Sequence, residues 1–348
     1  MAETMKAAVL HGIRDLRIDD VAKPTITDPG DVLIRVTAVG ICGSDIHFWE
    51  RMHVGDFVVE KPMTLGHESA GEVVEIGPAV TNLAVGDVVA IEPGRPCRRC
   101  ELCRTGHYNQ CHDMIFMACP PYDGAFSEYV VWPSDYCFKM PANMTAEEGA
   151  MMEPLSVGMH AVRRAGTMAG DTVAVFGSGP IGLVTLQSAK AHGATRIFAV
   201  DVVDARLQRA AALGATDIIN GAGQDAVAVI KEATCGRGVD ATFECAGAIP
   251  TMHQAMQACR NGGMVQLVGN QTEMLPPVPF FEIMNRELTV KGTFRYVNTY
   301  PASIAVTAAG LVDVRALITH HYTLAELPEA IAWVHENKDK VVKAAVRP

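Results

Sequence analysis

The second half of the chain alternates two kinds of segment, and this alternation constrains the fold more than any other feature. From Asp171 onward, short apolar runs alternate with alanine-rich stretches of helical composition. Strands that alternate with helices form βαβ units, whose strands lie parallel in one sheet. The runs expected as strands are 172–176, 196–200, 217–219, 240–244, 264–268 and 288–291. These runs predict an α/β fold with a doubly wound parallel sheet over 156–292.

A glycine-rich turn follows the first of these expected strands. Residues 177–182 read GSGPIG and precede a helix expected over 183–191. A GxGxxG motif between a strand and a helix is typical of Rossmann dinucleotide binding. Gly177 would make the tight turn, Gly179 would let the backbone approach a pyrophosphate, and Gly182 would allow close helix packing. The N–H groups at the helix start would then face the phosphates.

The second expected strand ends at an acid that bears on the choice of nucleotide. Asp201 lies about twenty residues beyond the glycines, where a carboxylate binds the ribose hydroxyls. Such a carboxylate would repel a 2′-phosphate, so we expect NAD rather than NADP. Arg206 leaves NADP open, since an arginine could accommodate the phosphate if Asp201 turned away. A ligand-free turn with Asp201 as a helix cap is the alternative without any nucleotide.

The first half of the chain has a different texture. From Lys6 to about Tyr136, short β-like runs such as 32–37 and 71–77 are broken by turns. The 348 residues suit two domains better than one core. We expect a mostly β domain made of 1–155 and 293–348, and a nucleotide-binding domain over 156–292.

Composition excludes several classes of function. The chain has 29 Lys and Arg against 39 Asp and Glu, so a broad attraction for nucleic acid or anionic lipid is not expected. The first residues carry an acid and show no basic segment followed by an apolar one. No apolar stretch reaches the roughly 18 residues that a membrane span needs. We therefore expect a cytoplasmic protein whose substrate is a small molecule.

Four of the ten cysteines lie within fifteen residues, in a segment that we call the tetra-Cys lobe (95–112). They are Cys97, Cys100, Cys103 and Cys111. Four thiolates at these spacings can close a tetrahedron around zinc, with no position left open for substrate. Surface cysteines without metal are the alternative. Nearby arginines would offset the charge of a tetrathiolate zinc, namely Arg95, Arg98, Arg99 and Arg104.

A second group of residues has the composition of a catalytic zinc site. Such a site uses three protein ligands of N, S and O type and keeps one position open. Cys42 and His67 are expected as the first two ligands, and either Glu68 or Glu153 as the third. Asp45 would accept a hydrogen bond from the other ring nitrogen of His67 and so fix its tautomer. Taken singly, each of these residues is more often part of a core than a ligand.

The chain resembles the zinc-containing medium-chain dehydrogenases over essentially its whole length. Residues 66–68 read GHE, and Gly71, Gly77 and Val80 follow at the spacing of the zinc alcohol dehydrogenase signature. The segments 40–47, 152–158 and 292–296 are similar to those of sorbitol and xylitol dehydrogenases. The resemblance implies a GroES-like, mostly β catalytic domain beside the Rossmann domain. It also implies one catalytic and one structural zinc per chain.

The resemblance further implies roles for particular residues. Cys42, His67 and Glu68 would hold the catalytic zinc, with Glu153 at the water that this zinc binds. Ser44 and His47 would pass the proton to solvent, although His47 could equally be a surface imidazole. The residues implied around NAD are Gly177, Gly179, Pro180, Ile181, Gly182, Asp201, Arg206, Val268, Gly269, Phe294 and Arg295. Those implied near the substrate are Phe48, Phe116, Glu153, Arg295 and Tyr296.

These features predict an NAD-dependent polyol dehydrogenase that oxidises a secondary hydroxyl of a xylitol- or sorbitol-type substrate to the ketose. Phe48 stands where animal sorbitol dehydrogenases have Tyr, which removes one possible hydroxyl contact to the polyol. One alternative is a related zinc dehydrogenase for L-threonine, butanediol or a simple alcohol. Another is a nucleotide-binding relative without catalysis. The resemblance also implies a homo-oligomer, for which a tetramer is favoured and a dimer is the alternative.

Overall fold

The computed structural model describes residues 3–270 and 278–348. Residues 1–2 of the expected β domain and 271–277 of the expected nucleotide-binding domain lie outside the described residues. The chain divides into two compact units. The first unit comprises Met1–Glu153, Tyr300–Ala308 and Val314–Pro348, and the second comprises Pro154–Thr299 and Ala309–Asp313.

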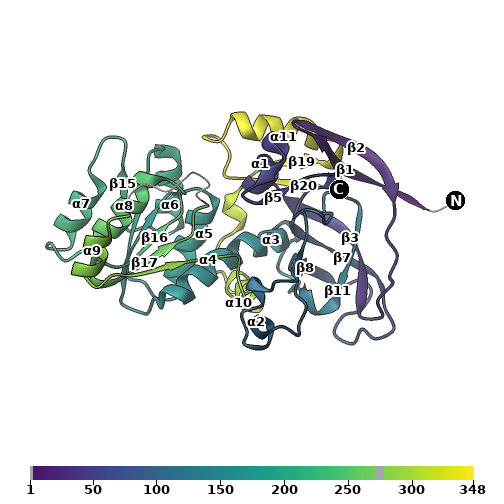
Figure 1. Cartoon of the computed structure of the whole chain (residues 1–348), viewed down its shortest axis with the longest axis horizontal. Helices are drawn as coiled ribbons and strands as arrows, with labels where there is room; N and C mark the ends of the chain where they lie inside the picture. The colour runs from purple at the N-terminus through teal and green to yellow at the C-terminus, as the bar shows by residue number, and fades with distance from the viewer. Residues whose placement is uncertain (1–2, 271–277) are drawn as a thin grey trace. The chain divides into compact units, whose positions relative to one another are not determined.

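The first unit is built on β-sheet, most of it antiparallel (Figure 1). Its largest sheet has the order β12-β8-β7-β3-β20-β19, and β11 also pairs with β3. The strands are β3 Asp31–Gly40, β7 Glu68–Ile76, β8 Val88–Ile91, β11 Tyr129–Pro133, β12 Cys137–Lys139, β19 Ile318–Thr323 and β20 Lys343–Arg347. A smaller sheet joins β1 Thr4–Gly12, β2 Asp15–Ala22 and β6 Met63–Thr64. Two-residue strands form two further ribbons: β4 His53–Val54 with β5 Phe57–Val58, and β9 Gly94–Arg95 with β10 Ile115–Phe116.

Short helices complete the first unit. They are α1 Gly43–Arg51, α2 Glu101–Arg104, α3 Ala146–Ala150, α10 Tyr300–Ala308 and α11 Leu327–Glu336, with 3-10 turns η1 Tyr108–Gln110, η2 Ser134–Tyr136, η3 Arg315–Leu317 and η4 Leu324–Glu326. The central strand β3 is buried along nearly its whole length because β7, β11 and β20 all pair with it. Apolar side chains of β3 therefore form the middle of the core.

The second unit contains the predicted doubly wound parallel sheet. Its strand order is β15-β14-β13-β16-β17-β18, which is the order 3-2-1-4-5-6 of dinucleotide-binding folds. The strands are β13 Thr172–Phe176, β14 Arg196–Asp201, β15 Asp217–Asn220, β16 Val239–Glu244, β17 Cys259–Leu267 and β18 Thr289–Gly292. The α/β prediction is confirmed. The predicted start of the fifth strand at 264 is wrong, because β17 already begins at Cys259, before a glycine pair that interrupts the apolar pattern.

Helices pack on this sheet in two groups (Figure 1). The first group consists of α5 and α6, which contact each other. The second consists of α7, α8 and α9, in which α8 contacts the other two. Their bounds are α5 Pro180–Ala191, α6 Asp204–Leu213, α7 Ala226–Ala233, α8 Ile249–Ala258 and α9 Phe280–Asn285, and α4 Met152–Ala165 precedes the sheet. Helix α5 begins at Pro180, earlier than expected, since proline is well suited to the first helical position. No helix among the described residues is long and apolar enough to cross a membrane.

Candidate active site and nucleotide site

Three potential zinc ligands come together in the first unit. Strand β3 ends at Gly40, two residues before Cys42, and Gly40 pairs with Glu68 in the antiparallel register of β3 and β7. This pairing brings the start of α1 to the start of β7. One ligand atom each of Cys42, His67 and Glu68 lies within 4.8 Å of the others. Sulfur, imidazole nitrogen and carboxylate oxygen are donors that zinc accepts in catalytic sites, so this donor set fits the metal.

The carboxylate of Asp45 fixes the backbone around these residues. It is fully buried and accepts the N–H of Cys42 at 2.9 Å and the N–H of Gly66 at 3.1 Å. The distance from Asp45 Oδ1 to His67 Nδ1 is 3.8 Å, which is too long for a hydrogen bond. The predicted hydrogen bond to the His67 ring is therefore absent, because Asp45 serves the two backbone amides instead. Burial raises the pKa of Asp45.

A buried lysine that the sequence did not reveal holds Glu68. Lys343 Nζ on β20 lies 2.6 Å and 2.7 Å from the two carboxylate oxygens of Glu68. The same ammonium donates to the carbonyl of Ile41 at 3.1 Å. All three N–H groups of the lysine thus have acceptors. A carboxylate has about four lone-pair sites, so Glu68 retains some for a metal.

Glu153 is buried in the first turn of α4. Its negative charge contributes to the electrostatics of His67 and Lys343. Burial by itself would lower the pKa of His67, but Cys42, Asp45 and Glu153 together raise it well above its usual value. Both Glu68 and Glu153 therefore belong to one acidic environment around His67.

Four other expected active-site residues lie in the same unit. Ser44 and His47 are half-buried on α1, and burial lowers the pKa of His47. Phe48 is buried in the hydrophobic core. The ring centroid of Phe116 lies 5.7 Å from that of His67. Of the two phenylalanines, Phe116 is thus the one in contact with an expected ligand.

The tetra-Cys lobe has the geometry of a four-thiolate site. The sulfur–sulfur distances are 3.4 Å for Cys100 and Cys103, 3.8 Å for Cys100 and Cys111, and 3.9 Å for Cys97 and Cys103. A zinc tetrahedron with Zn–S bonds of about 2.3 Å has edges of roughly 3.8 Å. Backbone N–H groups of Arg99 and Cys100 lower the pKa of Cys97 to about 6, whereas burial raises that of Cys103 to about 12. The lobe therefore fits a closed structural zinc.

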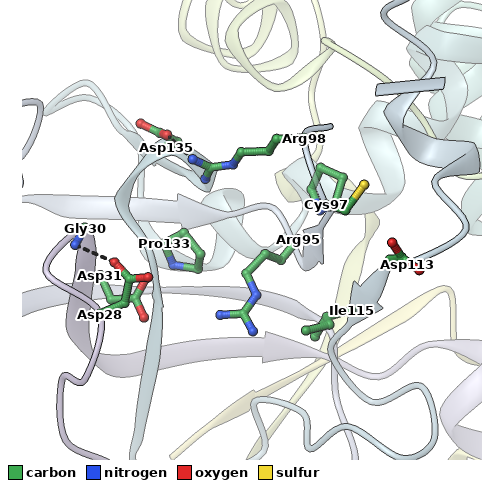
Figure 2. A pocket seen from close by; sticks show the side chains of 11 residues that line it. Asp28, Gly30, Asp31, Arg95, Cys97, Arg98, Asp113, Ile115, Pro133 and Asp135 are labelled. Carbon is green, nitrogen blue, oxygen red and sulfur yellow. Dashed lines mark hydrogen bonds and ion pairs between the residues drawn. The ribbon is translucent and has the colours of Figure 1, made fainter. Parts of the chain in front are cut away.

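The side chains of two of the lobe's arginines do not contact the sulfur of Cys97. Figure 2 shows the guanidinium groups of Arg95 and Arg98 directed away from the sulfur of Cys97, beside a surface cavity of about 500 Å³. Arg98 pairs with Asp135 at 2.9 Å, and the guanidinium of Arg95 lies 5.9 Å from the ring centroid of Trp132. These two arginines thus do not offset the charge of the thiolates by direct contact.

The glycine motif of the second unit has the geometry that a dinucleotide fold requires. Gly177 has a φ of +95°, which a residue with a Cβ rarely adopts. A Cβ at Gly182 would lie 1.8 Å from the carbonyl oxygen of Gly177. Beside Gly179, the N-cap of α5, a Cβ would meet open space. Backbone N–H groups at the start of α5 are therefore accessible to a phosphate, which fits a nucleotide.

Asp201 lies at the end of β14, next to this motif. Its carboxylate accepts the N–H groups of Ser178 at 2.7 Å, Val202 at 2.8 Å and Val203 at 2.9 Å. Arg206 Nη1 lies 4.0 Å from Asp201 Oδ2. Asp201 is thereby fixed beside the glycine turn, and the arginine that could neutralise a 2′-phosphate is close to it.

The remaining residues expected around the nucleotide and substrate follow the carboxyl ends of strands. Val268 and Gly269 follow β17, and both donate backbone N–H groups to the carbonyl of Glu244 at 2.8 Å. Glu244 was not predicted, yet its side chain also accepts from Ala246, Gly247 and Thr251. The segment after β18 holds Phe294, Arg295 and Tyr296. Phe294 is exposed, the guanidinium of Arg295 lies 4.8 Å from its ring centroid, and Tyr296 is buried.

Comparison with known proteins agrees with this geometry. Residues 28–142 match the alcohol dehydrogenase GroES-like domain, and residues 180–309 match the zinc-binding dehydrogenase domain. The sorbitol dehydrogenase of Bacillus subtilis is 43% identical over 99% of this chain and 98% of its own length. The L-idonate 5-dehydrogenase of Vitis vinifera is 47% identical over 93% of this chain and 89% of its own length.

Solved structures show the same similarity. The 2R,3R-butanediol dehydrogenase of Bacillus subtilis superposes with a TM-score of 0.90 at 37% identity, covering 99% of each chain. The L-idonate 5-dehydrogenase of Escherichia coli superposes with a TM-score of 0.92 at 28% identity, covering 100% of this chain and 99% of its own. The donor set in the first unit and the doubly wound sheet in the second are the parts that such an enzyme needs. The chain belongs to the zinc-dependent medium-chain dehydrogenase family, in the branch that includes sorbitol dehydrogenase and D-xylulose reductase.

Proposed function

We propose that this enzyme transfers a hydride from a secondary hydroxyl of a xylitol- or sorbitol-type polyol to NAD⁺ and forms the ketose. The observation that carries the proposal is the set of Cys42, His67 and Glu68, whose ligand atoms lie within 4.8 Å of one another in a zinc-binding dehydrogenase. The names of the relatives support a polyol, because they include sorbitol dehydrogenase and D-xylulose reductase at 43% and 44% identity.

Each residue has a role in this proposal. Cys42, His67 and Glu68 hold zinc, which when bound supplies Lewis acidity that lowers the pKa of a coordinated hydroxyl from about 16 toward about 7. Glu153 orients the hydroxyl from the same acidic environment. Ser44 and His47 carry the released proton toward solvent, and burial, which lowers the pKa of His47, keeps its imidazole ready to accept a proton. A second zinc at the tetra-Cys lobe has a purely structural role.

The second unit provides the nucleotide site in this proposal. We assign catalysis to residues 1–155 and 293–348, and NAD binding to residues 156–292. The start of α5 receives the pyrophosphate, and Asp201 receives the adenosine ribose. A dehydrogenase from Sinorhizobium meliloti, 32% identical to this chain, was solved with NADP, so the choice of nucleotide needs measurement. Asp201, fixed by three backbone amides, is the reason for proposing NAD.

A second candidate substrate class is a vicinal diol, since the butanediol dehydrogenase structure is similar over nearly its whole length. Initial rates of NADH formation with xylitol, sorbitol, ribitol, 2,3-butanediol, L-threonine and ethanol decide between the candidates. We expect the highest kcat/KM with a polyol of five or six carbons. A higher value with butanediol, threonine or ethanol would reassign the substrate, and absence of turnover with every compound would support a non-catalytic nucleotide-binding protein.

We also propose that the chain forms a homo-oligomer, a tetramer or a dimer, in the cytoplasm. On helix α9, Phe280, Phe281 and Met284 have exposed fractions of 75%, 71% and 71%. Strand β18, which follows α9 in the chain, forms an edge of the parallel sheet among the described residues. An apolar patch next to an open strand edge favours association of two copies. The ten free cysteines fit a reducing compartment. Light scattering of the parent and of Phe281→Glu tests the association, which the added charge should weaken.

A further inference from the structure

The tetra-Cys lobe is connected to the rest of its unit by a short stalk. The lobe begins at the last residue of β9 and ends before β10, and these two strands pair with each other. Strand β10 ends in Phe116, whose ring is tilted against that of His67 with centroids 5.7 Å apart. On the other side, β9 begins two residues after Glu92. One end of the lobe therefore adjoins Phe116, which contacts the expected ligand His67, and the other end adjoins Glu92.

One hydrogen bond links the interior of the lobe to Glu92. Tyr108 lies on the 3-10 turn η1, between Cys103 and Cys111. Its hydroxyl donates to Glu92 Oε1 at 2.8 Å, and Glu92 is only 2% exposed. This bond joins a residue inside the thiolate loop to a carboxyl group in the protein interior.

The backbone of Glu92 is fixed independently of this bond. Its N–H donates to the carbonyl of Tyr136, and its carbonyl accepts the indole N–H of Trp132, both at 2.8 Å. Only the direction of its side chain is therefore left for the Tyr108 hydroxyl to determine. Loss of that hydroxyl would reorient a carboxyl group without removing the strand that carries it.

The sheet places Glu92 beside the candidate zinc site. Glu92 directly follows Ile91 of β8, and Ile91 pairs with Ser69 of β7, the residue after the expected ligand Glu68. Burial, which is the main cause, and the charge of Glu153 raise the pKa of Glu92 to about 7. The path from the lobe to the zinc ligands thus runs from Tyr108 to Glu92 and across the pairing of β8 with β7 to Glu68.

A second attachment of the lobe is exposed to solvent. The ion pair of Arg98 with Asp135 has side chains 50% and 65% exposed, and exposed pairs contribute little. A surface cavity lined by Arg95, Cys97 and Ile115 lies beside the stalk (Figure 2). The part-buried bond from Tyr108 to Glu92 is therefore better placed than this ion pair to transmit the state of the lobe.

We propose that Tyr108 is a positioning residue: its hydroxyl fixes the carboxyl group of Glu92 beside the start of β7, so that closure of the tetra-Cys lobe by metal sets the geometry of the catalytic zinc site. This inference rests on the proposed function in that it assigns zinc to the Cys42 and His67 site. The metal of the tetra-Cys lobe would then affect catalysis as well as stabilise the chain.

The test compares Tyr108→Phe with Tyr136→Phe. The rings of these two tyrosines pack edge to face with centroids 6.2 Å apart, and of the two hydroxyls that of Tyr108 bonds to Glu92.

The catalytic zinc of each full-length enzyme is exchanged for Co²⁺ with the lobe zinc retained, as verified by metal analysis. The visible ligand-field spectrum is then recorded, and kcat and KM are measured on the zinc enzyme. We expect Tyr108→Phe to shift the spectrum and to lower kcat about tenfold with KM nearly unchanged, and Tyr136→Phe to match the parent.

Two variants of Glu92 complete the test. Glu92→Ala should reproduce the spectrum of Tyr108→Phe, and Glu92→Gln, whose amide oxygen still accepts from Tyr108, should lie closer to the parent. A parent-like spectrum in both Tyr108→Phe and Glu92→Ala would overturn the proposal. So would an equal shift in Tyr136→Phe. If the parent oxidises none of the polyols, the substrate assignment fails, but the Co²⁺ spectra still decide whether Tyr108 positions the metal site.

Discussion

Lys343 and Glu68 form a buried ion pair in which one ammonium contacts both oxygens of one carboxylate, at 2.6 Å and 2.7 Å. Their side chains are 4% and 1% exposed. Burial by itself would lower the pKa of Lys343, but the charge of Glu68 and the surrounding anions raise it. The lysine thus balances the charge of Glu68.

Replacement of Lys343 by Met should strongly destabilise the protein, because it leaves the Glu68 carboxylate buried without its partner. Breaking a buried pair in this way costs about 3–5 kcal/mol. Urea unfolding at pH 7 measures the change. Lys340→Met is the matched control, since Lys340 is exposed and bonds only to the side chain of Asn337, at 2.8 Å. A cost below about 1 kcal/mol for Lys343→Met would mean that the pair is not formed in solution.

Cys42→Ala should abolish turnover and leave NADH binding nearly intact. The sulfur of Cys42 is one of the three donors of the candidate catalytic site, whereas the nucleotide motif lies in the other unit. NADH fluorescence titration and initial rates measure the two properties separately. Cys235→Ala, at an exposed cysteine, controls for loss of a thiol. Simultaneous loss of NADH binding would identify Cys42 as a structural residue.

Asp201→Ala should reduce the preference for NAD over NADP. A charge-assisted hydrogen bond to ribose is worth about 1.5–3 kcal/mol, so loss of one should lower kcat/KM for NAD by about 10- to 150-fold. Removal of the carboxylate also frees Arg206, 4.0 Å away, to meet a 2′-phosphate. Asp204→Ala, an exposed acid in the first turn of α6, is the control. An unchanged ratio of the two kcat/KM values would remove Asp201 from the ribose site.

Metal analysis should find about two zinc ions per chain. The double variant Cys42→Ala/His67→Ala should retain one zinc with nearly the parent Tm. Cys100→Ser/Cys111→Ser should also retain one zinc but should melt at a lower temperature, because a closed four-thiolate site holds its loop together. One zinc in the parent, or two in either double variant, would show that at least one donor set does not bind zinc.

The stability contribution of Asp240 should depend on pH. Burial by itself raises its pKa, but hydrogen bonds from Arg237, Arg260 and the Thr172 N–H outweigh burial and lower the pKa to about 2. A carboxyl group with a lowered folded-state pKa stabilises the fold above its unfolded pKa of about 4, and this gain disappears as the pH falls toward 2.

The lowering of the pKa from 3.8 to about 2 corresponds to about 2 kcal/mol at neutral pH. Asp240→Asn should therefore cost about that amount at pH 7 and about half as much at pH 3, as measured by urea unfolding at both values. Glu232→Gln, at an exposed position in the same unit, should cost little at either pH. A cost for Asp240→Asn that is equal at the two pH values would contradict the role of its ionised form.

Local sequence patterns predicted several elements because their physical causes are local. The GxGxxG turn depends on the backbone conformation of Gly177 and on the contact between Gly182 and Gly177, which are only five residues apart. The cysteines of the tetra-Cys lobe lie close along the chain, so their spacing alone limits the loop that they can close. Strand β17 was predicted too short because Gly262 and Gly263 interrupt its apolar pattern, although Cys259 already pairs with Val239 of β16 and the pairing resumes at Met264 after an irregularity.

The sequence by itself thus determined the fold class, the nucleotide motif and the identities of the potential zinc donors. Only the tertiary structure decided what surrounds those donors. Lys343 lies 275 residues from Glu68, and nothing in its local sequence marks it as buried. Asp45 bonds to backbone amides instead of His67, and Tyr108 reaches Glu92. The physical reason is that ion pairs and hydrogen bonds of buried groups depend on which strands become neighbours, and that neighbourhood is a property of the whole sheet.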